Sequence, residues 1–77
     1  MSSKIPVLKG KTVIKALEKA GFMIKRTTGS HIILKNHTTG KVVVVPMHGA
    51  KDVKRGTLFG IIRQTGLSVE TFINLLS

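Results

Sequence analysis

Three histidines supply the only side chains in this sequence that ordinarily titrate near neutral pH. His31 follows Thr28-Gly29-Ser30, where a tight turn leads into an apolar run, and a strand start fixes a side chain more firmly than a loop tip does. Imidazole is the side chain most often used to accept or donate a proton near neutral pH, so a histidine fixed at this position is a candidate acid–base catalyst. His37 stands in a turn segment, where we expect it to be solvated. A histidine at the edge of a strand is also commonly structural, so the motif alone leaves that interpretation open.

The acidic residues are too few and too scattered for several kinds of active site. Glu18, Asp52 and Glu70 are the only three, and they fall in different predicted elements. A metal-dependent nuclease needs clustered carboxylates or histidines, and a glycosidase needs a pair of carboxylates. The chain has no cysteine, no phosphate-binding glycine loop and no dinucleotide fingerprint. We therefore expect neither a metal nor a cofactor.

Positive charge dominates the composition. Thirteen lysines and arginines against three acids give the 77 residues a formal net charge of +10. Such a charge says little about the fold, but it favours a polyanionic partner: RNA, DNA, an acidic protein or an anionic membrane. With no tryptophan or tyrosine and three phenylalanines, recognition of single-stranded RNA by base stacking is disfavoured. The remaining mode of recognition is contact from lysine and arginine to the phosphates. Such contacts do not distinguish one base from another, so we expect weak sequence specificity.

Two groups of cations stand out in the sequence: Lys11, Lys15 and Lys19, and Lys51, Lys54 and Arg55. The first group recurs every four residues, so it forms one stripe of a predicted helix. The second crowds the loop that enters the next predicted helix, whose N-terminus can itself bind phosphate. Each group is equally compatible with an ordinary solvated surface.

Helical and strand-like periodicity alternate along the chain. We expect a helix over residues 11–20, strands over 22–26, 30–35 and 41–45, a loop over 46–54, and two further helices. Gly66 ends the first of these two helices, and Ser68 is a suitable N-cap for the last. Residues 1–9 show no periodic signal. The short links predict a three-stranded antiparallel meander with helices covering one face.

The other face of this sheet is predicted to be open. If Ile32 and Leu34 point to the core, then His31 and Lys35 share the opposite face and lie near one another. The four valines at 42–45 alternate in the same way, so one pair points to the open face. An apolar patch there, beside His31 and rimmed by positive charge, would suit an acidic protein partner. The alternative is a strand whose outer valines are merely half-exposed.

Three segments, in order, resemble the HicA toxin family of bacteria and archaea. They are Gly29-Ser30-His31, Val44-Val45-Pro46-Met47-His48, and Lys54-Arg55-Gly56-Thr57-Leu58 running into Ile61-Ile62-Arg63-Gln64-Thr65-Gly66-Leu67-Ser68. The resemblance extends from about Lys9 to Ser68. It implies a fold like the double-stranded RNA-binding domain, in agreement with the α-β-β-β-α order. It also implies cleavage of mRNA and silencing by a HicB antitoxin encoded alongside.

The resemblance assigns roles to two histidines. The family's catalytic histidine corresponds to His31, and His48 matches a second recurring position. Many members have another histidine directly after the first, where this chain has Ile32. The physical hypothesis is metal-free cleavage, in which His31 takes the proton of a ribose 2′-OH and the product is a 2′,3′-cyclic phosphate. This chemistry would spare DNA, which lacks the 2′-OH. The candidates to stabilise charge on the phosphate are Lys35, Lys25 and Arg26.

We therefore predict a single HicA-like α+β domain over residues 1–77, acting as a cytoplasmic, metal-independent endoribonuclease toxin with His31 as its catalytic residue. The predicted RNA-binding residues are Lys11, Lys15, Lys25, Arg26, Ser30, Lys35, His48, Lys54 and Arg55. The predicted partners are mRNA and a HicB-like antitoxin, with no membrane and no small-molecule cofactor. One alternative is a non-catalytic double-stranded RNA- or DNA-binding module of the same fold, and another is an adaptor for an acidic protein.

Overall fold

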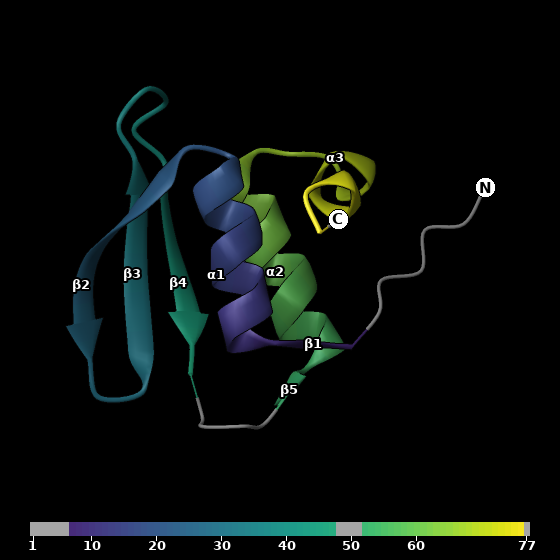
Figure 1. Ribbon diagram of the computed structural model, residues 1–77, viewed down its shortest axis with the longest axis horizontal. Coiled ribbons are helices and arrows are strands. Elements are labelled where there is room, and N and C mark those ends of the chain that lie inside the picture. The colour runs from purple at the N-terminus through teal and green to yellow at the C-terminus, as the bar shows by residue number, and fades with distance from the viewer. Residues whose placement is uncertain (1–6, 48–51, 77) are drawn as a thin grey trace.

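The computed structural model of the protein describes residues 7–47 and 52–76. Its elements are β1 (Leu8–Lys9), α1 (Gly10–Lys19), β2 (Phe22–Thr28), β3 (His31–Asn36), β4 (Val42–Pro46), β5 (Asp52–Val53), α2 (Arg55–Thr65) and α3 (Val69–Asn74). Strands β2, β3 and β4 form an antiparallel sheet in that order, and β1 pairs with β5 in a separate ladder (Figure 1). The predicted α+β class and the α-β-β-β-α-α order are confirmed, with the small ladder added.

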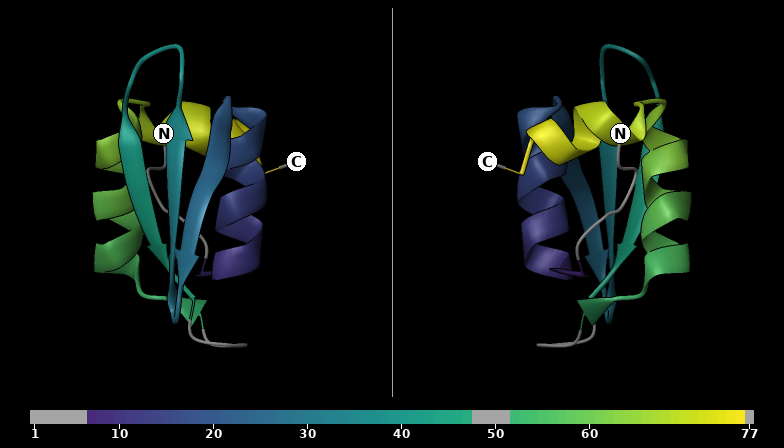
Figure 2. Two further views of the ribbon diagram at one scale, coloured as in Figure 1. Left: turned by 90° about the vertical axis from the view of Figure 1, so that its left-hand side faces the viewer. Right: turned by 90° about the vertical axis from the view of Figure 1, so that its right-hand side faces the viewer.

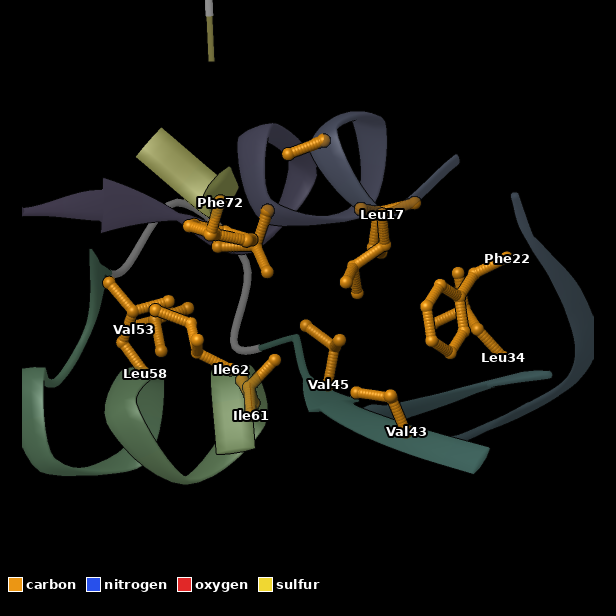
Figure 3. Close-up of a cluster of buried hydrophobic side chains, with 13 residues drawn as sticks. Leu17, Phe22, Leu34, Val43, Val45, Val53, Leu58, Ile61, Ile62 and Phe72 are labelled. Atoms are coloured by element: carbon orange, nitrogen blue, oxygen red, sulfur yellow. The ribbon is translucent and has the colours of Figure 1, made fainter. Parts of the chain in front are cut away.

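Helices α1 and α2 cover one face of the sheet, and α3 crosses them on the side away from it (Figure 2). The side chains between these layers form one apolar cluster (Figure 3). Leu17 of α1, Leu34 of β3 and Phe72 of α3 are completely buried in it. Burial of a side chain of this size contributes about 1.5–3 kcal/mol, so the cluster fixes the sheet against the helices.

Helix α2 ends and helix α3 begins where the sequence predicts. Gly66 follows α2 with φ 79°, a left-handed conformation that glycine adopts without a steric penalty, and its N–H donates to the carbonyl of Arg63. Ser68 caps α3, because its Oγ accepts a hydrogen bond of 3.1 Å from the N–H of Thr71. These features fix the end of α2 and the start of α3.

The β1–β5 ladder was not predicted. Leu8 is paired with Val53 and Lys9 with Asp52, within segments expected to be a loose lead-in and a loop. Two-residue strands are too short to show periodicity, and their pairing depends on where α1 and α2 lie. The ladder brings the starts of these two helices to the same end of the molecule (Figure 1).

Strand β2 is also longer than predicted, extending to Thr28 instead of Arg26. Its register with β3 shifts between Ile24 and Arg26, and the pairing then continues to the Thr28–His31 pair beside the turn. A bulge hides such an extension from a pattern search because it breaks the alternation of side chains. No helix within the described ranges is long and apolar enough to cross a membrane.

Candidate active site

His31 stands at the first position of β3, on the face of the sheet that the helices leave uncovered. It is paired with Thr28 on β2 and with Pro46 on β4. Directly paired residues project to the same face of an antiparallel sheet, so these three side chains form one row of the open face. Leu34 lies on the opposite, buried face, as predicted. The His31 residue is exposed to solvent.

An open cavity of about 640 Å³ lies beside His31. We call it the His31 groove, and its lining residues are His31, Val44, Pro46, Asp52, Val53, Lys54 and Thr57. They come from the open face of the sheet, from β5 and from the start of α2. Its volume lies within the range of about 300–1,000 Å³ that is typical of small-molecule sites, so the groove can receive a nucleotide.

Ser30 contacts the imidazole directly. Its Oγ lies 3.4 Å from Nδ1 of His31, and which of the two donates depends on the tautomer of the ring. The turn that places Ser30 here depends on Gly29, which adopts φ 47°. Apart from Gly29 itself and its two chain neighbours, nothing lies within 4 Å of a Cβ built on Gly29, so its conformation is what requires glycine there.

The start of α2 contributes two polar side chains to the groove, from Lys54 and Thr57. Lys54 occupies the N-cap position with an extended backbone and makes no side-chain capping hydrogen bond. The first turn contains no acidic residue, so the positive end of the helix dipole is not neutralised there. Within the described part of the chain, the Thr57 hydroxyl makes no hydrogen bond. Thr57 is not among the site residues predicted from the sequence. Its position three residues after Lys54 nevertheless places both on one side of a helix turn.

Tight packing holds the end of β4 at the groove. A Cβ built on Gly10, the first residue of α1, would overlap the Met47 side chain and lie 3.2 Å from the carbonyl oxygen of Pro46. Glycine therefore allows α1 to begin directly against the strand end. Because Pro46 also lines the groove, this contact positions one of its walls.

The predicted RNA-binding residues are distributed over three surfaces. Ser30 and Lys54 are at the groove, and Arg55 is the exposed first residue of α2. Lys35 and Arg26 belong to the open face by register, and Lys25 lies at the register shift of β2. Lys11 and Lys15 are exposed on α1, on the helical side of the sheet, and do not line the groove. His48 and Lys51 lie outside the described residues.

The open face combines apolar and basic side chains. Val42 and Val44 are 48% and 39% exposed, whereas Val43 and Val45 are completely buried, which confirms the predicted alternation. The register places Val42 in a row with Lys35 and Met23, the latter 60% exposed. We call this surface, with Ile33 and Arg26, the open sheet face.

The carboxylates and histidines of residues 7–47 and 52–76 do not gather in a group of three that could hold a metal ion. Asp52 is the one acidic residue of the groove, and its Oδ1 lies 3.4 Å from the Lys9 ammonium. His37 is exposed in the turn after β3, as expected. The chemistry available in the groove is therefore that of an imidazole, an ammonium, a hydroxyl and one carboxylate.

Comparison with known proteins supports the resemblance seen in the sequence. A family model described as the HicA toxin of bacterial toxin–antitoxin systems matches residues 10–67, which include the sheet, α1, α2 and the whole lining of the groove. A search of curated proteins found no match. Since the family match spans most of the 77 residues, this chain belongs to the HicA family of toxins from bacterial toxin–antitoxin systems.

Proposed function

We propose that this toxin is a single-domain, metal-independent endoribonuclease that cleaves mRNA in the cytoplasm, with His31 as its acid–base catalyst. The observation that supports this most directly is the His31 groove. It places an exposed imidazole, the Lys54 ammonium and the Thr57 hydroxyl around one cavity that can receive a nucleotide. The net charge of +10 favours a polyanionic substrate.

The proposed reaction is a transesterification within the RNA chain. Neutral His31 accepts the proton of a ribose 2′-OH, and the 2′ oxygen forms a bond to the adjacent phosphorus. The bond from phosphorus to the 5′ oxygen breaks, and this oxygen takes up a proton, for which the groove offers the Lys54 ammonium and water. The products are a 2′,3′-cyclic phosphate and a free 5′-OH. In the tautomer whose Nδ1–H donates to Ser30 Oγ, the ring nitrogen that accepts this proton is Nε2.

We propose that Lys54 and Thr57 bind the phosphate that undergoes reaction. Both line the groove with His31, whereas Lys35, Lys25 and Arg26, the candidates from sequence, do not. An ammonium and a hydroxyl can each donate a hydrogen bond to a phosphate oxygen and stabilise the charge that develops on it. Lys35 and Arg26 are better placed to contact the RNA backbone along the open sheet face.

The partner that we propose is an acidic, HicB-like antitoxin bound to the open sheet face. Exposed Val42 and Met23 offer apolar contact there, and Lys35 and Arg26 offer positive charge beside it. The free edge of β4 is a poor alternative because Gln64 Oε1 already accepts from the Val44 N–H at 3.3 Å. A protein seated on this face would also cover His31.

The experiment that tests the enzyme is incubation of purified protein with a long mRNA in EDTA, beside the His31→Ala variant. Cleavage by the wild type alone, leaving cyclic-phosphate ends, is the expected result. RNA binding without cleavage by either protein would instead support the non-catalytic binding module of the same fold.

A further inference from the structure

We propose that the His31 groove contains a base-binding subsite in which Asp52 accepts a hydrogen bond from an exocyclic amino group of an RNA base. The inference rests on the proposed RNA-binding function of the groove. The subsite gives the protein a preference for adenine, cytosine or guanine over uracil at one position of the bound RNA. Phosphate contacts alone would provide no such preference.

Asp52 is the unexpected member of the groove. The chain has three acids against thirteen cations, and the other two acids, Glu18 of α1 and Glu70 of α3, do not line the groove. A carboxylate repels the phosphates that Lys54 would attract. Its presence at this position therefore calls for a favourable interaction that offsets the repulsion.

The contact with Lys9 is a weak structural reason for Asp52. The Nζ–Oδ1 distance is 3.4 Å, and the two side chains are 61% and 52% exposed. Ion pairs this exposed contribute little to stability. The β1–β5 ladder also includes the Leu8–Val53 pair, which does not involve a charge. The bridge uses Oδ1, and no hydrogen bond to Oδ2 is made within the described part of the chain.

The remaining oxygen defines the ligand chemistry. An ionised carboxylate only accepts hydrogen bonds, and the amino groups of adenine, cytosine and guanine donate them. Val44, 39% exposed, and Pro46 form the accessible apolar part of the lining, against which a flat base can lie. Among the described lining residues there is no phenylalanine, tyrosine or tryptophan on which a base could stack. A hydrogen bond to Asp52 is the contact that discriminates.

Binding of short 2′-O-methyl RNA separates base recognition from cleavage, because this RNA has no 2′-OH to attack. Affinities would be measured by fluorescence anisotropy for oligomers of A, C and U, and for a uridine oligomer with one guanosine or one inosine. We expect the preferred amino base to bind about 5- to 100-fold more tightly than uracil, the range for one good base contact. Inosine lacks the N2 amino group, so a guanosine–inosine difference would identify guanine.

Four variants show whether Asp52 is responsible. Asp52→Ala should reduce the preference to within about twofold, while Asp52→Asn, which keeps an acceptor oxygen, should retain part of it. Lys9→Ala removes the salt bridge but keeps the carboxylate, so its preference should be that of the wild type. Glu18→Gln changes the same charge outside the groove and should also leave the preference unchanged. Thermal melts of every variant check the fold.

Two results would overturn the subsite. Asp52→Ala could strengthen binding to every oligomer by one common factor, which would make the carboxylate only a source of repulsion. Alternatively, Lys9→Ala could abolish the preference as Asp52→Ala does, which would assign the effect to the ladder. If the preference depends on Asp52 but mRNA is not cut, the subsite holds and the proposed nuclease activity fails; if no oligomer binds, both fail.

Discussion

His31 and Lys54 line the same open groove, although one begins the middle strand of the sheet and the other caps the second long helix. In the proposed reaction the imidazole takes the proton of a ribose 2′-OH, and the ammonium holds the phosphate that the 2′ oxygen attacks. Neither β3 nor the first turn of α2 provides this combination alone. The fold therefore determines the candidate site by bringing the start of α2 to the His31 end of the sheet.

The strongest prediction concerns His31→Ala. We expect RNA cleavage to fall about 100- to 10,000-fold, the usual contribution of a positioned acid–base group. RNA affinity and thermal stability should change little because the side chain is exposed. His37→Ala is the matched control, since His37 is exposed in a turn away from the groove lining. Equal loss of activity in both variants, or full activity of His31→Ala, would refute the assignment.

Lys54→Ala should lower kcat/KM for RNA cleavage about 10- to 100-fold, because a hydrogen bond from a charged donor to the reacting phosphate is lost. The comparison is Lys19→Ala, which removes the same charge from the exposed surface of α1. A general electrostatic effect would weaken both variants to the same extent. Single-turnover rates on one RNA substrate distinguish the two cases.

The sequence predicts the parts of this fold that local patterns determine. The alternation of exposed Val42 and Val44 with buried Val43 and Val45 is a consequence of strand geometry. The end of α2 follows from Gly66 and the start of α3 from Ser68, because the backbone preference of glycine and the capping side chain of serine act within a few residues. The open face with His31 on it follows from the same alternation.

The groove itself could not be read from local patterns. Lys35 was a candidate phosphate ligand because it shares a strand face with His31, yet it does not line the groove. Asp52 is placed at the groove by the β1–β5 ladder, and Thr57 by the packing of α2. No local sequence pattern predicts the ladder or this packing. Contacts between segments that are distant in the sequence depend on how the whole core packs. They are therefore seen in the structure and not in local sequence patterns.

Substitutions of Thr57 test whether its hydroxyl contributes to RNA cleavage. Thr57→Val removes the hydroxyl but keeps the shape, and we expect kcat/KM to fall about threefold to tenfold, as for one neutral hydrogen bond. Thr57→Ser keeps the hydroxyl and should retain most of the activity. Thr12→Val is the matched control, because Thr12 holds the equivalent third position of α1. The assignment fails if valine and serine behave alike at residue 57.

Val42→Glu tests the open sheet face as the antitoxin surface. Val42 is 48% exposed and does not line the His31 groove, so the variant should fold and cut RNA. A buried, unpaired carboxylate at an interface with an acidic partner is costly, and we expect at least a tenfold weaker complex. Val7→Glu adds the same charge at a side chain that is 66% exposed but lies outside this face. Co-purification with the antitoxin and rescue of growth measure the effect, and undiminished rescue of the Val42→Glu toxin would place the partner elsewhere.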